Sequence, residues 1–245
     1  MTTRTVPETI DQDWERFYTE FPDIYDRFAV TSPVVATKID KLFGVRGKIV
    51  VDVGSGTGRS TFALADKARL VIGVDPWSAM RQFAVAKARQ ARVRNVVFLE
   101  GVAQRLPLRD RSVDLIVAIL GVPLVFRDSD AGDRLIADLF VPDALRALRP
   151  GGYVVSVEGA PGPPDPAVGR RSTVSMAQQV HDVIAGRHGF QYRDIYVEQE
   201  YSSLREAIET FGFIYGKDAI GYLRRTGRTR YRNRMRIHYK QSAAP

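Results

Sequence analysis

Apolar and polar positions alternate in blocks along the middle of the chain. Runs of apolar, largely β-branched residues are typical of strands covered on both faces, and stretches with apolar residues at helical spacing separate them. The expected strands are 48–53, 70–75, 96–99 and 112–120, and 148–158 is expected to be a turn followed by a fifth strand. The expected helices are 58–68, 77–92 and 135–148, the last kinked or divided at Pro142. This alternation predicts an α/β fold with a parallel sheet.

The two flanking regions have different patterns. After a polar tail over 1–12, the segment from Trp14 to Phe43 is helical in spacing and carries an aromatic stripe. Beyond 158, we expect a Pro- and Gly-rich loop over 159–169, helices over 172–188 and 204–225, and strands over 192–201 and 231–239. The second helical stretch is expected to break at Phe211-Gly212-Phe213 and at Tyr215-Gly216. We therefore expect one domain, with an N-terminal helical cap (1–45), a core (46–158) and a C-terminal half (159–245).

The stretch from Val50 to Gly58 brings in candidate chemistry. Its apolar strand contains Asp52, a carboxylate that is costly to bury without a partner. Glycines at 54, 56 and 58 follow, and glycine lets the backbone turn sharply and approach a ligand closely. A dinucleotide site would have its third glycine at position 59, which is Arg59, and no Walker lysine follows. A plain tight turn and a nucleotide dehydrogenase are the alternatives at this point.

The stretch resembles motif I of the class I S-adenosylmethionine-dependent methyltransferases, in which a strand ends in (D/E)-x-G-x-G-x-G. Two further stretches match that family in order: Glu100 to Leu108 is similar to its G-D-A-x-x-L-P motif, and Leu148 to Gly152 to its L-(K/R)-P-G-G turn. The resemblance implies a Rossmann-like doubly wound seven-stranded sheet, in strand order 3-2-1-4-5-7-6 with the last strand antiparallel. It also implies S-adenosylmethionine as cofactor and no metal.

Asp75 ends the second strand and can accept hydrogen bonds from both ribose hydroxyls, a role that also occurs in NAD enzymes. The resemblance further implies that Asp52 faces the methionine amino group. Val102 stands where the family has an acid that reads adenine, while the Ala103 N–H can still donate. The predicted cofactor-binding residues are Asp52, Gly54, Ser55, Gly56, Thr57, Gly58, Asp75, Pro76, Val102, Ala103 and Ile119.

No catalytic residue stands out in the sequence. The absence of cysteine excludes disulfides, thiolate metal sites and a cysteine nucleophile. No general base is evident after the fourth strand, over 121–126. His181, His188 and His238 are expected at the surface or at helix ends, and Tyr25 is an equally weak candidate.

The net charge of +8 permits a nucleic-acid partner without requiring one. Eight basic residues and no acid lie near the C-terminus: Arg224, Arg225, Arg228, Arg230, Arg232, Arg234, Arg236 and Lys240. We call this the basic strip and expect it to be a solvated strand face. The longest nearly apolar run, Leu115 to Phe126, is too short to span a bilayer, so a cytoplasmic enzyme is expected.

The sequence thus predicts methyl transfer to an O, N or C nucleophile of a small molecule. Two alternatives stay open: an RNA methyltransferase that uses the basic strip, and a non-catalytic protein that binds S-adenosylmethionine. The acceptor and the oligomeric state do not follow from the sequence.

Overall fold

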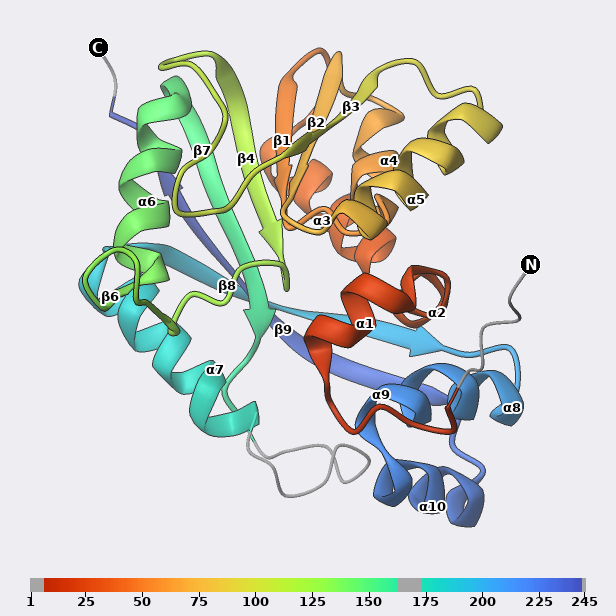
Figure 1. Cartoon of the computed structure of the whole chain (residues 1–245). Coiled ribbons are helices and arrows are strands. Elements are labelled where there is room, and N and C mark those ends of the chain that lie inside the picture. The colour runs from red at the N-terminus through yellow and green to blue at the C-terminus, as the bar shows by residue number, and fades with distance from the viewer. Residues whose placement is uncertain (1–6, 163–172, 244–245) are drawn as a thin grey trace.

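A computed structural model of the chain describes residues 7–162 and 173–243, so part of the polar tail and of the loop expected over 159–169 lies outside the described residues. Its centre is a seven-stranded sheet in the order β3-β2-β1-β4-β7-β9-β8 (Figure 1). The strands are β1 (Ile49–Val53), β2 (Leu70–Asp75), β3 (Val96–Glu100), β4 (Val113–Ile119), β7 (Leu148–Gly159), β8 (Gln191–Glu200) and β9 (Arg230–Gln241), and a small hairpin adds β5 (Arg127–Asp128) and β6 (Arg134–Leu135).

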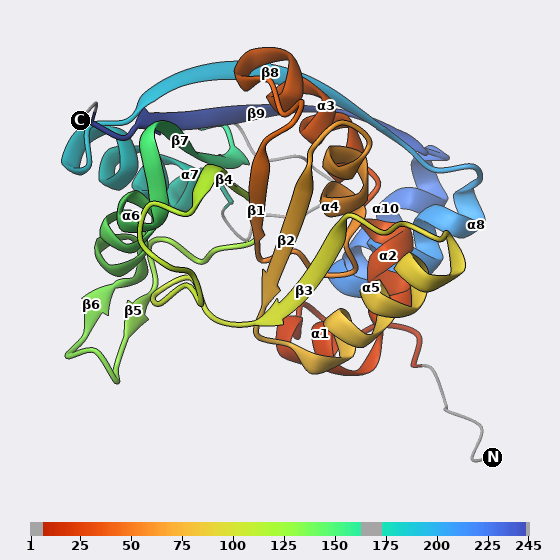
Figure 2. The same ribbon diagram turned by 90° about the horizontal axis from the view of Figure 1, so that it is seen from above.

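The pairing of these strands confirms the predicted topology. Strands β3, β2, β1, β4 and β7 are parallel neighbours, and β9 runs antiparallel to both β7 and β8. Counted in chain order within the large sheet, this is 3-2-1-4-5-7-6 with the last strand antiparallel. Figure 2 shows β8 and β9 as two long strands that run past the end of β7 toward α8 and α10.

Helices cover both faces of the sheet. They are α1 (Trp14–Glu20), α2 (Pro22–Phe28), α3 (Ser32–Phe43), α4 (Arg59–Ala65), α5 (Ser78–Gln90), α6 (Ile136–Ala147), α7 (Thr173–His181), α8 (Leu204–Ala207), α9 (Phe213–Tyr215) and α10 (Lys217–Thr226), with π-helical segments over Asp182–Arg187 and Ile208–Gly212. One core cluster joins the sheet to α6 and α7 through residues such as Phe140 and Val180, and another joins it to α3 and α4 through Ile39 and Leu64.

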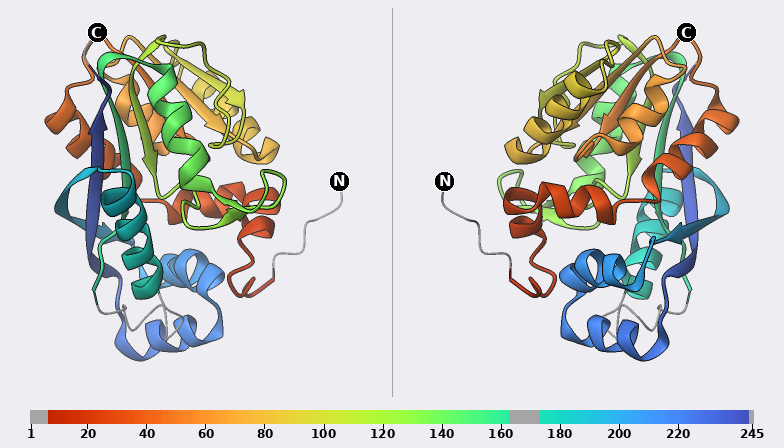
Figure 3. Two further views of the ribbon diagram at one scale, coloured as in Figure 1. Left: turned by 90° about the vertical axis from the view of Figure 1, so that its left-hand side faces the viewer. Right: turned by 90° about the vertical axis from the view of Figure 1, so that its right-hand side faces the viewer.

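The N-terminal cap packs against the C-terminal helices. Phe17 and Phe21 of the cap form one buried cluster with Phe213 and Ile214, and Figure 3 shows α8, α9 and α10 gathered below α1 and α2. The cap is thereby held at the carboxyl ends of the parallel strands, the edge at which open α/β sheets bind ligands. No helix within the described ranges is long and apolar enough to cross a membrane.

One of the two expected breaks in the C-terminal helical region is confirmed. Gly216 (φ 89°, ψ −172°) ends α9 and starts α10, in a conformation that glycine adopts without strain. The break expected at Phe211-Gly212-Phe213 was wrong, because the π-helical segment continues directly into α9 there. Pro142 lies inside a single helix, α6, so it does not divide that helix.

Candidate functional site

The glycine turn joins β1 to α4 with positive φ at all three glycines: 71° at Gly54, 53° at Gly56 and 82° at Gly58. A Cβ at Gly54 would lie 2.3 Å from the carbonyl oxygen of Gly121, because the segment that follows β4 crosses the turn at this point. A Cβ at Gly56 would instead lie 3.0 Å from the Tyr25 ring. Gly54 is therefore required by backbone packing, whereas the face of Gly56 is covered by a side chain of the cap.

Asp52 is 1% exposed and ties β1 to the start of α4. Its Oδ2 accepts hydrogen bonds from Ser60 Oγ at 2.7 Å and Thr61 Oγ1 at 2.6 Å. Its Oδ1 is buried and has no hydrogen-bond partner among the described residues. Burial raises the pKa of Asp52 to about 6, although the two hydroxyls oppose the shift. The residue thus holds the turn in place and keeps one acceptor atom free.

Asp75 ties the same turn to β2. Its Oδ2 accepts from the Gly56 N–H at 2.8 Å, and its Oδ1 accepts from the Trp77 N–H at 2.9 Å. Burial raises the pKa of Asp75, and these two N–H groups oppose that rise. Because a carboxylate oxygen can accept two hydrogen bonds, both oxygens can still accept from a ligand.

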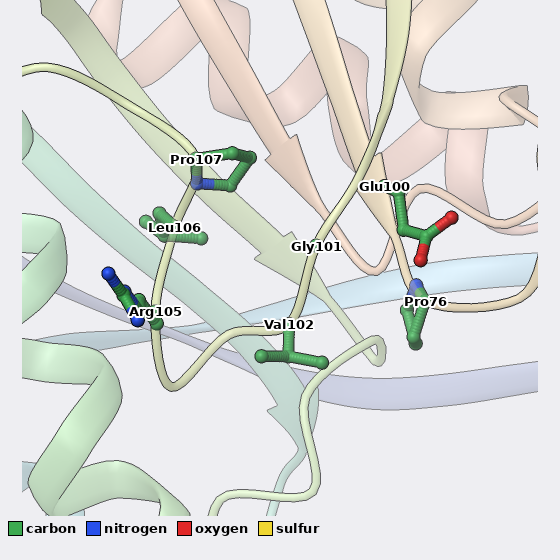
Figure 4. A pocket seen from close by; sticks show the side chains of 7 residues that line it. All are labelled: Pro76, Glu100, Gly101, Val102, Arg105, Leu106 and Pro107. Carbon is green, nitrogen blue, oxygen red and sulfur yellow. The ribbon is translucent and has the colours of Figure 1, made fainter.

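A groove of about 400 Å³ lies beside Asp75, at the ends of β2 and β3. Its lining is Pro76, Glu100, Gly101, Val102, Arg105, Leu106 and Pro107; Figure 4 shows Pro76 and Glu100 on one side and Arg105, Leu106 and Pro107 on the other, with Val102 between them. Val102 is 42% exposed and offers the groove an apolar surface. The side chain of Gln104, two residues further on, donates to Asp128 Oδ2 at 2.8 Å.

Aromatic side chains of the cap lie over the turn. Tyr25 packs against Gly56, Tyr18 lies between Tyr25 and Trp77 with ring centroids 5.6 and 6.1 Å away, and burial raises the pKa of both tyrosines. Asp26 of α2 forms ion pairs with Lys87 of α5 at 2.6 Å and with Arg59 of α4 at 3.7 Å. The cap is thus fastened to the helices on both sides of the turn.

The segment after β4 places Leu120 at the surface, next to Ile119, one of the predicted cofactor-binding residues. Ile119 is buried in the core with Val157, whereas Leu120 is 53% exposed and has a positive φ of 51°. Phe126 is 52% exposed. A non-glycine residue with positive φ is uncommon, and such strain is concentrated at functional sites. Exposed apolar side chains therefore follow the strand end next to the turn.

The expectation that each histidine lies at the surface or at a helix end is wrong for His238. It is 1% exposed on β9, and its Nε2 lies 3.2 Å from Nδ1 of His181, which ends α7. Burial and the neighbouring His181 and Arg236 lower the pKa of His238 to about 4. His188 instead pairs with Asp138 at 2.9 Å.

The basic strip is not an open cationic face. Arg230 pairs with Glu200 at 2.7 Å, and Asp194 pairs with Arg236 at 2.6 Å and with Arg234 at 3.8 Å. The guanidinium of Arg232 lies 4.5 Å from the ring centroid of Tyr196. The acids of β8 thus neutralise much of the charge of β9.

Sequence reasoning missed Glu158, at the end of β7. It is half-buried, and its Oε1 accepts from Ser156 Oγ at 3.3 Å. Burial raises the pKa of Glu158 to about 8. The sequence contains a signal for this residue, because Glu158, like Asp75, is an acid at the end of an apolar strand.

These residues fit the cofactor that the motifs imply. S-adenosylmethionine carries an ammonium group, ribose hydroxyls and a flat base. The free Oδ1 of Asp52 can accept from the ammonium, the oxygens of Asp75 can accept from hydroxyls, and the apolar groove at Val102 can take the base. Ser55 and Thr57 lie in the turn with buried hydroxyl oxygens that have no partner in the described parts of the chain.

Comparison with known proteins shows which proteins this chain is similar to. Residues 51–156 match the family described as "Methyltransferase domain". The chain is 29% identical over 132 residues to a malonyl-[acyl-carrier protein] O-methyltransferase of Marinomonas sp., covering 54% of this chain and 46% of that protein. It is 30% identical over 158 residues to a demethylmenaquinone methyltransferase of Beutenbergia cavernae, covering 61% and 60% respectively.

Solved structures share the fold. A SAM-dependent methyltransferase from Aquifex aeolicus superposes with a TM-score of 0.54 at 17% identity, covering 95% of both chains. A phosphoethanolamine N-methyltransferase from Haemonchus contortus gives 0.52 at 18% identity, covering 95% of this chain and 48% of that one. These likenesses confirm the predicted fold. The matched part of this chain spans only about half to three fifths of the length of the two curated relatives.

Proposed function

We propose that the chain transfers a methyl group from S-adenosylmethionine to a small-molecule acceptor, and the match of residues 51–156 to the methyltransferase domain family supports this. One observation carries the proposal: Asp52 and Asp75, on adjacent strands, hold a single glycine turn, and Asp52 keeps an unpaired, buried oxygen. A turn held in this way presents carboxylate oxygens and backbone to one ligand.

The proposed division of labour follows from the contacts. The cofactor, when bound, supplies an electrophilic methyl group. Asp52 accepts from its ammonium group, Asp75 accepts from the ribose hydroxyls, and Pro76, Val102 and Ala103 surround the base. The rest of the site has to hold the acceptor in line with the methyl group, which lowers the barrier through positioning. We also propose that the chain is one domain, with the N-terminal cap over 1–45, the cofactor-binding core over 46–158 and the C-terminal half over 159–245.

An apolar organic acceptor is favoured over RNA. The segment after β4 presents Leu120 and Phe126, both more than half exposed, to the surface. The paired arginines of the basic strip leave few free cations for phosphates, and phosphate contacts dominate nucleic-acid affinity. Two relatives are named as a malonyl-[acyl-carrier protein] O-methyltransferase and a demethylmenaquinone methyltransferase, and these names support an organic acceptor rather than RNA.

Calorimetric binding of S-adenosylmethionine, S-adenosylhomocysteine and NAD tests the cofactor. We expect the two sulfur nucleosides to bind and NAD not to bind. Binding of NAD alone, or of none of the three, would overturn the proposal.

A screen of acceptors tests the reaction. Demethylmenaquinone, malonyl-[acyl-carrier protein] and total RNA, each at low and high salt, are suitable probes. Methylation of RNA that falls steeply with salt would favour the RNA alternative. Cofactor binding without turnover of any acceptor would favour the non-catalytic alternative.

A further inference from the structure

Glu158 lies at the same edge of the sheet as the glycine turn. β1, β4 and β7 are consecutive parallel neighbours, and the Leu120 N–H donates to the Val157 carbonyl at 2.9 Å. Since Ile119 pairs with Val157, the next register step places Leu120 beside Glu158. Neighbouring strands are about 4.8 Å apart, so Glu158 lies roughly 10 Å from the end of β1. Figure 1 shows β4 and β7 ending side by side, on the side of the molecule where α1 and α2 lie.

The chain between these two points crosses the site. Gly121 follows Leu120, and a Cβ at Gly121 would lie 2.8 Å from the carbonyl oxygens of Val53 and Gly54. One short path, Gly54 to Gly121 to Leu120 to Glu158, therefore runs from the cofactor turn to the carboxyl group. Its surface is apolar at Leu120 and acidic at Glu158.

Glu158 has no cation partner within the described ranges. Arg236 stands directly opposite it in the β7–β9 register, yet the guanidinium bonds to Asp194 of β8 at 2.6 and 3.1 Å. Arg234 of β9 lies 3.8 Å from Asp194, and Tyr192 of β8 lies under the Arg236 guanidinium. His238 of β9, whose lowered pKa keeps it neutral near pH 7, lies 3.2 Å from His181 of α7. Ser156 is the single side-chain donor to Glu158 among these contacts.

Burying an ionised carboxyl group without a cation partner costs free energy, unless a ligand pairs with it or a proton neutralises it. Its partial exposure leaves it accessible to a ligand at the strand ends. The three comparable acids at strand ends or turns, Asp52, Asp75 and Asp114, each have at least two hydrogen-bond donors. Glu158 therefore differs from the structural acids of this sheet.

We propose that Glu158 is a catalytic acid–base group of the acceptor cleft, which faces the reacting methyl group and takes the proton of a hydroxyl acceptor, and that Ser156 positions it. This inference rests on the proposed function. As the oxygen–methyl bond forms and the methyl–sulfur bond breaks, the electron pair of the broken bond stays on sulfur. The proton of the acceptor hydroxyl passes to Glu158, which returns it to solvent.

The charge of the cofactor offers a test that needs no acceptor. S-adenosylmethionine carries a positive sulfonium, whereas the thioether of S-adenosylhomocysteine is neutral, and the two share the ammonium and ribose groups. Any protons that Asp52 or Asp75 release on ligand binding are therefore released with either ligand. A carboxyl that faces the sulfonium releases an additional proton with S-adenosylmethionine alone, because a nearby positive charge favours its ionised form.

The experiment is calorimetric titration of both ligands at pH 7 in two buffers of different ionisation enthalpy, which gives the number of protons released. Wild-type protein is expected to release more protons with S-adenosylmethionine than with S-adenosylhomocysteine. Glu158→Gln is expected to lose this difference and to bind S-adenosylhomocysteine with an affinity within threefold of wild type. Glu200→Gln, which removes an exposed acid of β8, is the matched control and keeps the difference.

The outcomes separate the two proposals. If neither ligand binds to wild-type protein, the proposed function fails. If both bind and the difference is absent, or persists in Glu158→Gln, the role of Glu158 is overturned. Should Glu158→Gln not fold, Ser156→Ala decides the matter, because loss of the hydroxyl donor moves the pH of greatest proton release upward. If Ser156→Ala leaves the pH of greatest proton release unchanged, the inference is also overturned.

Turnover gives a second readout. For any hydroxyl acceptor that wild-type protein methylates, Glu158→Gln is expected to lower kcat by about 10²- to 10⁴-fold with little change in KM, the usual size of a general-base contribution. Ser156→Ala should lower kcat less and shift the pH profile.

Discussion

Two parts of the edge formed by the carboxyl ends of the parallel strands are built in different ways. We call the part around Asp52, Asp75 and the glycine turn the cofactor edge, and the part around Glu158 the acceptor edge. At the cofactor edge, Asp52 and Asp75 take their hydrogen bonds from Gly56, Ser60, Thr61 and Trp77, all within 19 residues along the chain. At the acceptor edge, Glu158 and Ser156 of β7 lie next to His238 of β9, which contacts His181 of α7. The first edge depends on local sequence, and the second depends on how distant segments come together.

This difference has a physical consequence. Short-range hydrogen bonds require particular residue types at fixed spacing, so the cofactor edge has a recognisable motif. The acceptor edge has no such constraint, and its polar groups keep fewer internal partners. A site with fewer internal partners can change its acceptor without loss of the fold. The predictions below test the two edges against each other, from the largest expected effect to the smallest.

Gly54→Ala is expected to have the largest effect. A Cβ at this position meets the Gly121 carbonyl oxygen at 2.3 Å, and φ is 71°. Strain at positive φ together with the backbone clash should lower the free energy of unfolding by about 2 to 5 kcal/mol. Denaturant unfolding, monitored by circular dichroism, measures this loss of free energy.

Gly47→Ala is the matched control, because its φ is 72° and nothing lies within 4 Å of its added Cβ. Gly47→Ala should lower the free energy of unfolding only by the conformational strain at positive φ, about 1 to 2 kcal/mol. Equal losses in the two variants would show that the crossing of Gly54 and Gly121 does not constrain the cofactor edge.

Asp52→Asn tests the cost of burying a carboxylate at the cofactor edge. Burial raises the pKa of Asp52 from 3.8 to about 6, so its contribution to stability is fully present below pH 3.8 and is lost as the pH rises through 6. Between pH 4 and 7, the stability of Asp52→Asn relative to wild type should therefore rise by about 2 to 3 kcal/mol. Unfolding measured at several pH values checks this, and a constant difference would contradict it.

The parallel core was predictable because its signals are local. The continuous apolar run at β1 predicts burial on both faces, and Val50, Val51 and Val53 are indeed at most 2% exposed. Asp114, an acid near the start of the apolar strand β4, accepts from the Ile49 N–H at 2.8 Å and from Arg149 at 2.7 Å. In such cases residue type and spacing determine the contact.

The rest could not be predicted because it depends on pairing across the sheet. Alternation placed His238 on the same strand face as four arginines, and a solvated face was expected there. The register of β9 against β7 and β8 instead puts His238 opposite Ser156 and Tyr192, where α7 covers it. Likewise, nothing in the sequence indicates that Arg236 bonds to Asp194 rather than to Glu158.

Asp75→Asn tests ligand binding at the cofactor edge. The amide keeps the shape but removes the charge and one acceptor, so affinity for S-adenosylmethionine and S-adenosylhomocysteine should fall about 10- to 100-fold, the worth of one hydrogen bond to a charged group. Calorimetry measures the change. Asp194→Asn, the same substitution on β8, should leave affinity unchanged. A similar loss in both variants would mean that charge in general, rather than Asp75, favours binding.

The smallest effect is expected on the far side of the acceptor edge, in the basic strip. Arg230 and Glu200 are an exposed pair, with side chains 65% and 58% exposed, and such pairs contribute less than about 1 kcal/mol. Replacement of Arg230, Arg232 and Arg234 by Gln should leave S-adenosylhomocysteine binding unchanged. If the strip bound RNA, each lost arginine would reduce the slope of log affinity against log salt by about 0.7. We expect no change in that slope, because acids of β8 pair with Arg230 and Arg234, and Arg232 lies over the Tyr196 ring.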